Sequence, residues 1–113
     1  MSDAEEERTP IARIFHALAD PTRRQMVERV SQGPVTVSEL ARPFSITLAA
    51  ALQHVQALER SGLVRTEKKG RVRLVKIAPD GLTVLRNWMD DRRSLWETRL
   101  EGLDAMLQEK PNQ

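Results

Sequence analysis

The feature that most constrains the fold is a pair of adjacent helix signals near the middle of the chain. Thr36 and Glu39 form a capping box, which predicts that a short helix begins there. Residues 43–46 leave a tight connection, and Thr47 then caps a second helix that ends at Gly62. Two helices joined by so short a turn are typical of a helix-turn-helix.

A basic hairpin is predicted directly after these helices. Two strand-like segments, 63–68 and 72–77, are separated by a turn with Gly70 at its tip. Residues 60–76 contain seven basic side chains and one acid, although the net charge of the whole chain is only +2. Clustered positive charge is expected where a polyanion binds, but lysine and arginine can also serve only to solvate a hairpin. Charge alone favours neither polyanion binding nor simple solvation of the hairpin.

Helical patterns flank this unit on both sides. One begins at Pro10, and another begins where Asp20 precedes a proline. Beyond the hairpin, residues 79–81 interrupt the pattern, and one long helix is predicted from Leu82 to about Gln108. We therefore expect a mainly α fold of about five helices with a β-hairpin wing, which is a winged helix-turn-helix.

Length and composition fit one domain. The chain has 113 residues, of which 40% are hydrophobic and 30% charged, as in globular proteins. We expect a single domain over residues 9–109, an acidic disordered tail over 1–8 and a frayed tail over 110–113. No apolar run approaches the ~18 residues of a membrane span, and the N-terminus is acidic where a secretory signal would be basic and then apolar. A cytoplasmic location follows as an expectation.

Residues suited to catalysis or metal binding are scarce. The chain has no cysteine, no tyrosine and no glycine-rich phosphate loop. His16 and His54 fall on different predicted helices, with no ligand or nucleophile pattern between them. Asp90 and Asp91 are adjacent in a helix and would point about 100° apart, which makes a poor cation site. We therefore expect no enzyme activity, no cofactor and no metal site.

The second helix of the pair has a face suited to a DNA groove. On a helical wheel, five apolar residues share one broad sector, which is expected to be buried: Leu48, Ala51, Leu52, Val55 and Leu58. The other side is small and amide-bearing, and such side chains can contact a thymine methyl or an adenine edge. The alternative is an ordinary amphipathic helix in which alanine only favours helix formation.

The predicted DNA-binding residues fall into two groups. Those on the recognition helix are Thr47, Ala49, Ala50, Gln53, His54, Gln56 and Arg60. Those on the wing, expected to contact phosphates or the adjacent minor groove, are Lys68, Lys69, Arg71 and Arg73.

The same stretches carry a family resemblance. FHALADPTRRQMVERV (15–30) and TVSELARPFSITLAAALQHVQALERSGLVRTEKKGRVRLVKI (36–77) resemble the arsenic-repressor-like (ArsR/SmtB) family of winged-helix transcriptional regulators. The similarity extends into LWETRLEGLDAML (95–107). It implies a homodimer that binds a palindromic operator, most often as a repressor.

Some positions depart from the family pattern. Leu52 replaces a serine that often contacts DNA, and we interpret it as a packing residue; Val75 replaces an aromatic residue of the wing. At His54 the family allows a phosphate contact or a structural hydrogen bond, and we favour the second. The cysteine and histidine ligands of metal-sensing relatives are missing from the matching helices.

The first and last helices are expected to form the dimer. The long last helix would leave an apolar stripe exposed in one copy, unless the stripe folds back on its own domain. The predicted interface residues are Ile11, Ile14, Phe15, Trp88, Leu95, Trp96, Leu100, Leu103 and Leu107. Pairing them with a second copy would place two recognition helices about one DNA turn, ~34 Å, apart.

The sequence therefore predicts a sequence-specific, double-stranded-DNA-binding transcriptional regulator, a homodimeric repressor that occludes a palindromic operator. One alternative is a winged-helix protein-interaction module without DNA binding, against which the dense basic wing argues. Another is a repressor controlled by an unrecognised metal or small-molecule effector. Activation in place of repression also stays open.

Overall fold

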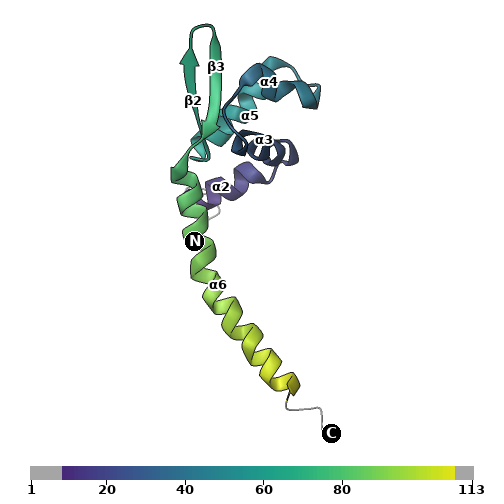
Figure 1. The fold of residues 1–113 in the computed structure, drawn as a ribbon, viewed down its shortest axis with the longest axis vertical. Helices are drawn as coiled ribbons and strands as arrows, with labels where there is room; N and C mark the ends of the chain where they lie inside the picture. The colour runs from purple at the N-terminus through teal and green to yellow at the C-terminus, as the bar shows by residue number, and fades with distance from the viewer. Residues whose placement is uncertain (1–8, 109–113) are drawn as a thin grey trace.

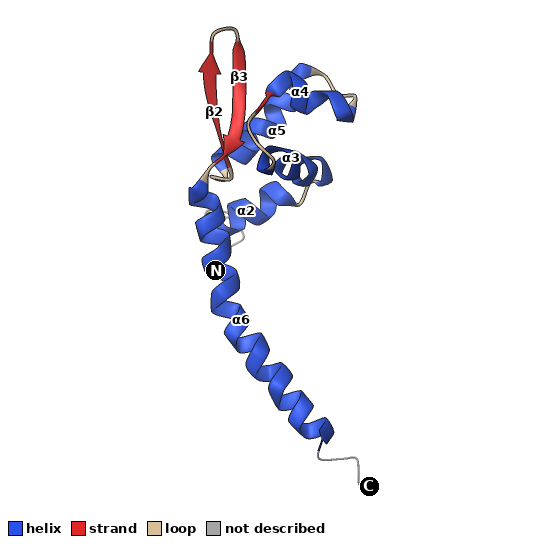
Figure 2. Ribbon diagram, in the orientation of Figure 1, coloured by secondary structure: helices blue, strands red, loops and turns tan. Residues whose placement is uncertain are grey.

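The computed structural model describes residues 9–108 and has a winged helix-turn-helix architecture, as the sequence predicts (Figures 1 and 2). The expected tails, 1–8 and 110–113, lie outside the described residues, as does residue 109. In chain order the elements are α2 (Pro10–Leu18), α3 (Pro21–Ser31), β1 (Val35–Thr36), α4 (Val37–Ala41), the 3-10 helix η1 (Arg42–Phe44), α5 (Leu48–Arg60), β2 (Val64–Lys69), β3 (Val72–Ile77) and α6 (Pro79–Gln108).

Side-chain caps fix the beginnings of the helices near the predicted positions. The Asp20 carboxylate accepts hydrogen bonds from the backbone N–H groups of Thr22 (2.8 Å) and Arg23 (3.1 Å) at the start of α3. Thr36 and Thr47 each accept one from the backbone N–H three residues later, at the starts of α4 and α5. These bonds satisfy donors that a helix start leaves without a partner, so both helices of the helix-turn-helix begin at defined residues.

The sheet has three strands in the order β1-β3-β2, all antiparallel to their neighbours. The sequence predicts only the β2–β3 hairpin. The added strand, β1, is two residues long and pairs Val35 with Val75 and Thr36 with Leu74. So short a strand leaves no alternating pattern in the sequence. Its pairing attaches the base of the wing to the start of α4.

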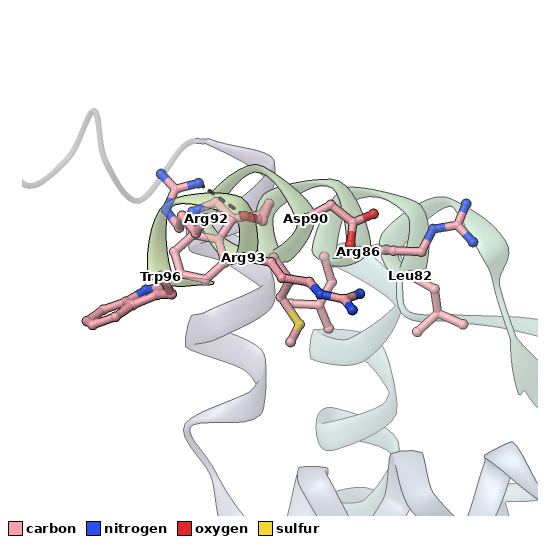
Figure 3. A pocket seen from close by; sticks show the side chains of 9 residues that line it. Leu82, Arg86, Asp90, Arg92, Arg93 and Trp96 are labelled. Atoms are coloured by element: carbon pink, nitrogen blue, oxygen red, sulfur yellow. Dashed lines mark hydrogen bonds between the residues drawn. The ribbon is translucent and has the colours of Figure 1, made fainter. Parts of the chain in front are cut away.

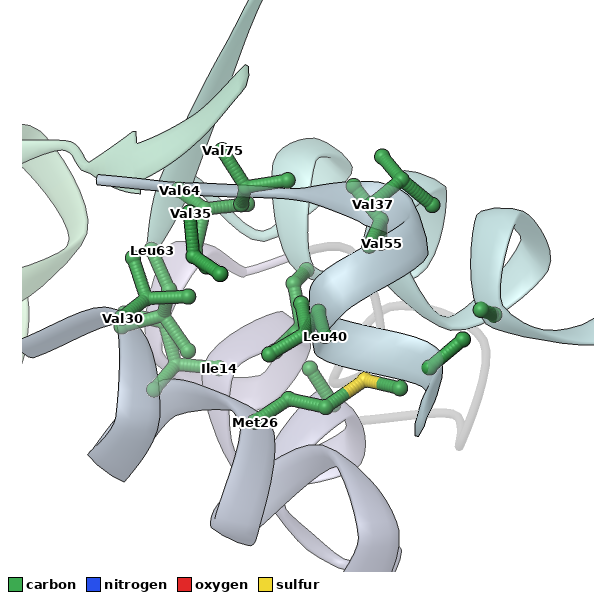
Figure 4. Close-up of a cluster of buried hydrophobic side chains, with 14 residues drawn as sticks. Ile14, Met26, Val30, Val35, Val37, Leu40, Val55, Leu63, Val64 and Val75 are labelled. Carbon is green, nitrogen blue, oxygen red and sulfur yellow. The ribbon is translucent and has the colours of Figure 1, made fainter. Parts of the chain in front are cut away.

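One apolar cluster joins these elements (Figure 4). Its largest fully buried side chains come from α2, α3, α4, α5, the sheet and the turn before β2: Ile14, Met26, Val30, Val35, Leu40, Val55, Leu58, Leu63, Val64 and Val75. Burial of each such side chain stabilises the fold by about 1.5–3 kcal/mol before entropy is counted. The recognition helix and the wing are therefore held on one packed base.

A close backbone contact sets where the last helix begins. Gly62 follows α5 with a φ of +84°, and its carbonyl oxygen accepts a hydrogen bond from the N–H of Gly81 (2.9 Å). A Cβ at Gly81 would lie only 2.5 Å from that oxygen, so glycine is required there. The helix starts at Pro79 and not at the predicted Leu82, because proline fits the first turn of a helix.

The last helix leaves the body of the protein after its first turns. Helix α6 has 30 residues, about 45 Å at the usual rise, and it projects away from the other elements (Figure 1). Near its start, the ring of Trp88 packs edge-on against that of Phe15 on α2, with centroids 4.9 Å apart. From residue 89 to 108 every side chain is exposed. The apolar stripe therefore does not fold back on its own domain.

One predicted dimer residue has a different role. Ile14 is completely buried in the core of the single chain, so it is not available to a second copy. It lies on the side of α2 that faces the core, whereas Phe15, the next residue, is 43% exposed. Successive helical residues point about 100° apart. The predicted interface covers a sector of the helical wheel wide enough to include both Ile14 and Phe15, so the sequence pattern does not distinguish them.

Candidate nucleic-acid interface

Helix α5 presents a face that is rotated slightly from the predicted one. Ala51, Val55 and Leu58 are buried as expected, and Leu52 packs, half-buried, against the core, which confirms its interpretation as a packing residue. Leu48 is predicted in the same sector, yet it is 57% exposed. Leu48 is the first residue of α5 and lies at the edge of the domain, whereas Ile46, in the preceding turn, packs against the core.

The predicted recognition residues are brought together on this helix, although not equally. Those that are exposed are Thr47, Ala49, Gln53, Gln56 and Arg60. Ala50 and His54 are half-buried, on the side of the helix turned away from the wing. Small side chains near the start and two amides farther along therefore form the open surface, which suits close approach and hydrogen bonding to base edges.

His54 links the recognition helix to α3. The Nε of Arg23 donates a hydrogen bond to Nδ1 of His54 over 3.2 Å, and both side chains are half-buried. This bond is of the kind favoured for His54 from the sequence, a structural hydrogen bond. Arg23 also belongs to the first turn of α3, where its N–H binds Asp20. This hydrogen bond, more than the nearby positive charges, lowers the pKa of the Asp20 carboxyl.

The cations of the wing divide into paired and unpaired groups. Lys76 donates to the Glu67 carboxylate at 2.8 Å, which lowers the pKa of Glu67. Within residues 9–108, the exposed cations at the wing tip form no ion pair: Lys68, Lys69 and Arg71. The uncompensated positive charge of the hairpin is therefore concentrated at its tip, the part of the wing most accessible to a phosphate backbone.

Arg73, on the wing strand β3, is linked to the recognition helix through Thr66 of β2. Its guanidinium donates to Oγ1 of Thr66 at 3.0 Å, and that hydroxyl donates to Oε2 of Glu59 at 3.0 Å. The backbone N–H of Thr66 also donates to Glu59, at 3.1 Å. These bonds fix β2 beside α5, across a hollow of about 230 Å³ that Gln56 also lines. Sequence reasoning missed Glu59 and Thr66, although they are seven residues apart, because the pair crosses the turn from a helix to a strand and belongs to the periodic pattern of neither.

A second surface lies along α6. A hollow of about 530 Å³ is lined by Leu82, Leu85, Arg86, Trp88, Met89, Asp90, Arg92, Arg93 and Trp96 (Figure 3). The Arg92 guanidinium stacks 4.1 Å from the centre of the Trp88 ring. Farther along, the predicted dimer residues are 50–59% exposed: Leu95, Trp96, Leu100, Leu103 and Leu107. Ile11, which is on α2, is half-buried.

Two further observations concern the described residues. Between 9 and 108, no group of three or more His, Cys, Asp or Glu side chains is arranged to hold a metal ion. In the same range, no helix combines the length and apolarity that a membrane crossing requires.

The helix-turn-helix with a cationic wing defines the chain as a DNA-binding protein of the winged-helix class, and comparison with known proteins agrees. Residues 18–67 match a helix-turn-helix domain family. The HTH-type transcriptional regulator Rv2034 of Mycobacterium tuberculosis is 37% identical over 95 residues, which cover 84% of this chain and 86% of the relative. The transcriptional repressor SdpR of Bacillus subtilis is 26% identical over 76 residues, covering 67% and 84%.

Solved structures lead to the same family. The crystal structure of an ArsR family transcriptional regulator is 46% identical and covers 79% of this chain and 98% of its own, with a TM-score of 0.73. A homodimeric winged helix-turn-helix DNA-binding domain, Mb0332 of Mycobacterium bovis, is 28% identical and covers 81% and 89%, with a TM-score of 0.62. The chain belongs to the ArsR family and is a DNA-binding transcriptional regulator.

Proposed function

We propose that the protein acts in the cytoplasm as a homodimeric repressor, which binds a pseudo-palindromic operator and blocks transcription by occupying it. The observation that carries this proposal is the position of its two surfaces. The recognition helix and the wing lie at one end of the molecule, and the exposed apolar stripe of α6 runs toward the other (Figure 1). A stripe used for dimerisation would leave both DNA-binding surfaces free.

The two DNA-binding elements have different tasks in this proposal. The exposed amides Gln53 and Gln56 enter the major groove and read base edges. Lys68, Lys69 and Arg71 bind phosphates, which supplies affinity and a dependence on salt, but little sequence preference. The Glu59–Thr66–Arg73 bonds link the wing to the recognition helix, so the two elements meet the DNA as one unit.

The stripe on α6 supports the dimer. Aromatic and aliphatic side chains that are more than half exposed along one helix are uncommon on a monomer surface and are typical of an interface. A twofold pair would require a palindromic site, because each half-site then receives one recognition helix. The homodimeric M. bovis domain and the repressor SdpR, both similar to this chain, support the two parts of the proposal.

The test measures binding and stoichiometry together. Fluorescence anisotropy compares a duplex from the region upstream of the protein's own gene with a scrambled duplex, each at two salt concentrations. Light scattering gives the mass of the protein alone and on DNA. We expect two copies per duplex, tighter binding to the upstream duplex and a steep loss of affinity with salt. A monomer that binds both duplexes equally would contradict the proposal.

A further inference from the structure

One exposed side chain has no place in the functions assigned above. Among the described residues outside α6, three large apolar side chains are more than 40% exposed: Phe15, Leu48 and Val72. Phe15 packs against the ring of Trp88, and Val72 lies in the wing beside its turn. Leu48 is the most exposed of the three, at 57%. The other large apolar residues of α5 are buried or half-buried, so Leu48 is the large apolar side chain that this helix leaves open to a binding partner.

The position of Leu48 is fixed by the start of the recognition helix. It is the first residue of α5, directly after Thr47, and the Thr47 hydroxyl accepts a hydrogen bond from the N–H of Ala50 at 3.0 Å. The cap stabilises the backbone of this first turn. In a helix-turn-helix, the residues at the beginning of the second helix are those that reach base edges in the major groove.

The surroundings of Leu48 are open and include a cation. It lines a shallow hollow of about 260 Å³ between α4 and α5, together with Ser38, Ala41, Arg42 and Ile46. Arg42 is exposed and sits at the end of the first helix, the one that crosses the phosphate backbone in such motifs. Arg42 and the unpaired cations of the wing tip are complementary to the phosphates of DNA. The apolar side chain of Leu48, beside Arg42, is complementary to an apolar group inside a DNA groove.

We propose that Leu48 determines part of the operator sequence by packing on the C5-methyl group of a thymine. This inference rests on the proposed function. An aliphatic side chain cannot donate or accept a hydrogen bond, so it can distinguish bases only by their apolar groups. In the major groove, thymine alone among the four bases carries a methyl group. Burial of one such group corresponds to about a fourfold difference in affinity.

Deoxyuridine provides the test, because it pairs like thymidine and lacks only that methyl group. A library of random duplexes is first selected for binding to the full-length protein. Each thymine of the selected site is then replaced singly by deoxyuridine. The wild-type protein is expected to lose about fourfold in affinity at one position of each half-site. Leu48→Ala should bind the thymine duplex about as weakly and should no longer distinguish the two bases at that position.

Leu48→Met serves as the matched variant, since it retains a long apolar side chain and should keep the difference between thymine and deoxyuridine. Circular dichroism melts establish that both variants are folded. If duplexes are selected but no substitution weakens the wild type, or if Leu48→Ala keeps the full difference, the role of Leu48 is overturned and the proposed function stands. If no duplex is enriched at all, operator binding itself fails, and this inference fails with it.

Discussion

The side chains of Arg23 and His54 are joined by a hydrogen bond of 3.2 Å, in which the Arg23 guanidinium donates to Nδ1 of the imidazole. The bond connects the first turn of α3 to the middle of the recognition helix. Because Nδ1 is the acceptor, the imidazole carries its proton on Nε2 when it is neutral. The contact thus supports the orientation of α5 on the core, at a position that could otherwise be taken for a DNA contact.

His54→Ala is expected to lower the free energy of unfolding by about 1–2 kcal/mol, since it removes a hydrogen bond to a charged and half-buried guanidinium. A double-mutant cycle with Arg23→Ala, measured by urea denaturation at fixed protein concentration, isolates the coupling between the two side chains. A coupling energy near zero, with a large loss of DNA affinity for His54→Ala alone, would instead place His54 on the phosphate backbone.

Acid should weaken the N-cap of α3. The backbone N–H of Arg23 holds the pKa of Asp20 below its ordinary value, so the ionised cap contributes stability above that value and loses it as the pH falls through the lowered pKa. Asp20→Ala should cost about 1 kcal/mol at pH 7. The difference from wild type should shrink below about pH 4. Asp20→Asn, which caps but does not titrate, is the control; an equal loss at pH 7 and at about pH 3.5 would contradict the assignment.

The tip of the wing should determine the salt dependence of DNA binding. Replacing Lys68, Lys69 and Arg71 by alanine is expected to reduce the slope of log K against log salt by about 0.9 for each phosphate that is no longer neutralised. Affinity should fall for specific and scrambled duplexes alike. The control is the neutral double variant Glu67→Ala/Lys76→Ala, which removes a pair already joined at 2.8 Å. A slope changed by the control and not by the triple variant would exclude phosphate binding at the tip.

Thr66→Val should weaken the attachment of the wing to α5 without creating a cavity in the core. It removes the hydroxyl that accepts from Arg73 and donates to Glu59, while the backbone N–H of residue 66 can still bind Glu59. We expect a loss of about 1 kcal/mol in stability and a fall in operator affinity, and Thr66→Ser should recover both. Measurement is by urea denaturation and by anisotropy. Unchanged affinity in Thr66→Val would mean that the wing binds DNA independently of α5.

Local signals explain why much of the fold could be predicted. The caps at Asp20, Thr36 and Thr47 act within one helical turn, so the residues that form them stand together in the sequence. The glycine turn of the hairpin is equally local. The expected wing, its tip cations and the amide face of α5 all follow from such short-range patterns.

Features that depend on packing between distant elements could not be predicted in the same way. The Arg23–His54 bond joins residues 31 positions apart. Ile14 and Leu48 both belong to apolar patterns, but only the arrangement of the helices decides that the first is buried and the second exposed. The close approach of Gly81, in the first turn of α6, to Gly62 likewise joins residues that are 19 positions apart. Periodicity defines a face of a helix, whereas neighbouring elements define how much of that face is covered.

The apolar stripe of α6 gives the sharpest test of dimerisation. Leu103 is 51% exposed and lies far from the core, so a charge placed there should not affect the fold of one copy. In a dimer, Leu103→Glu would bury an unpaired carboxylate at the interface, which is strongly unfavourable. We expect the variant to become monomeric in sedimentation velocity and to lose operator affinity, since each half-site would then be bound separately.

Ala105→Glu is the matched control, because residue 105 is also exposed and projects from the opposite side of the same helix, about 200° around from residue 103. It adds the same charge to the same segment and should leave the protein dimeric. Equal behaviour of the two variants would show that the stripe is not the interface. A monomeric Leu103→Glu that keeps its affinity for scrambled duplexes while losing that for the operator would show that the dimer supplies specificity and each wing supplies the affinity common to all DNA.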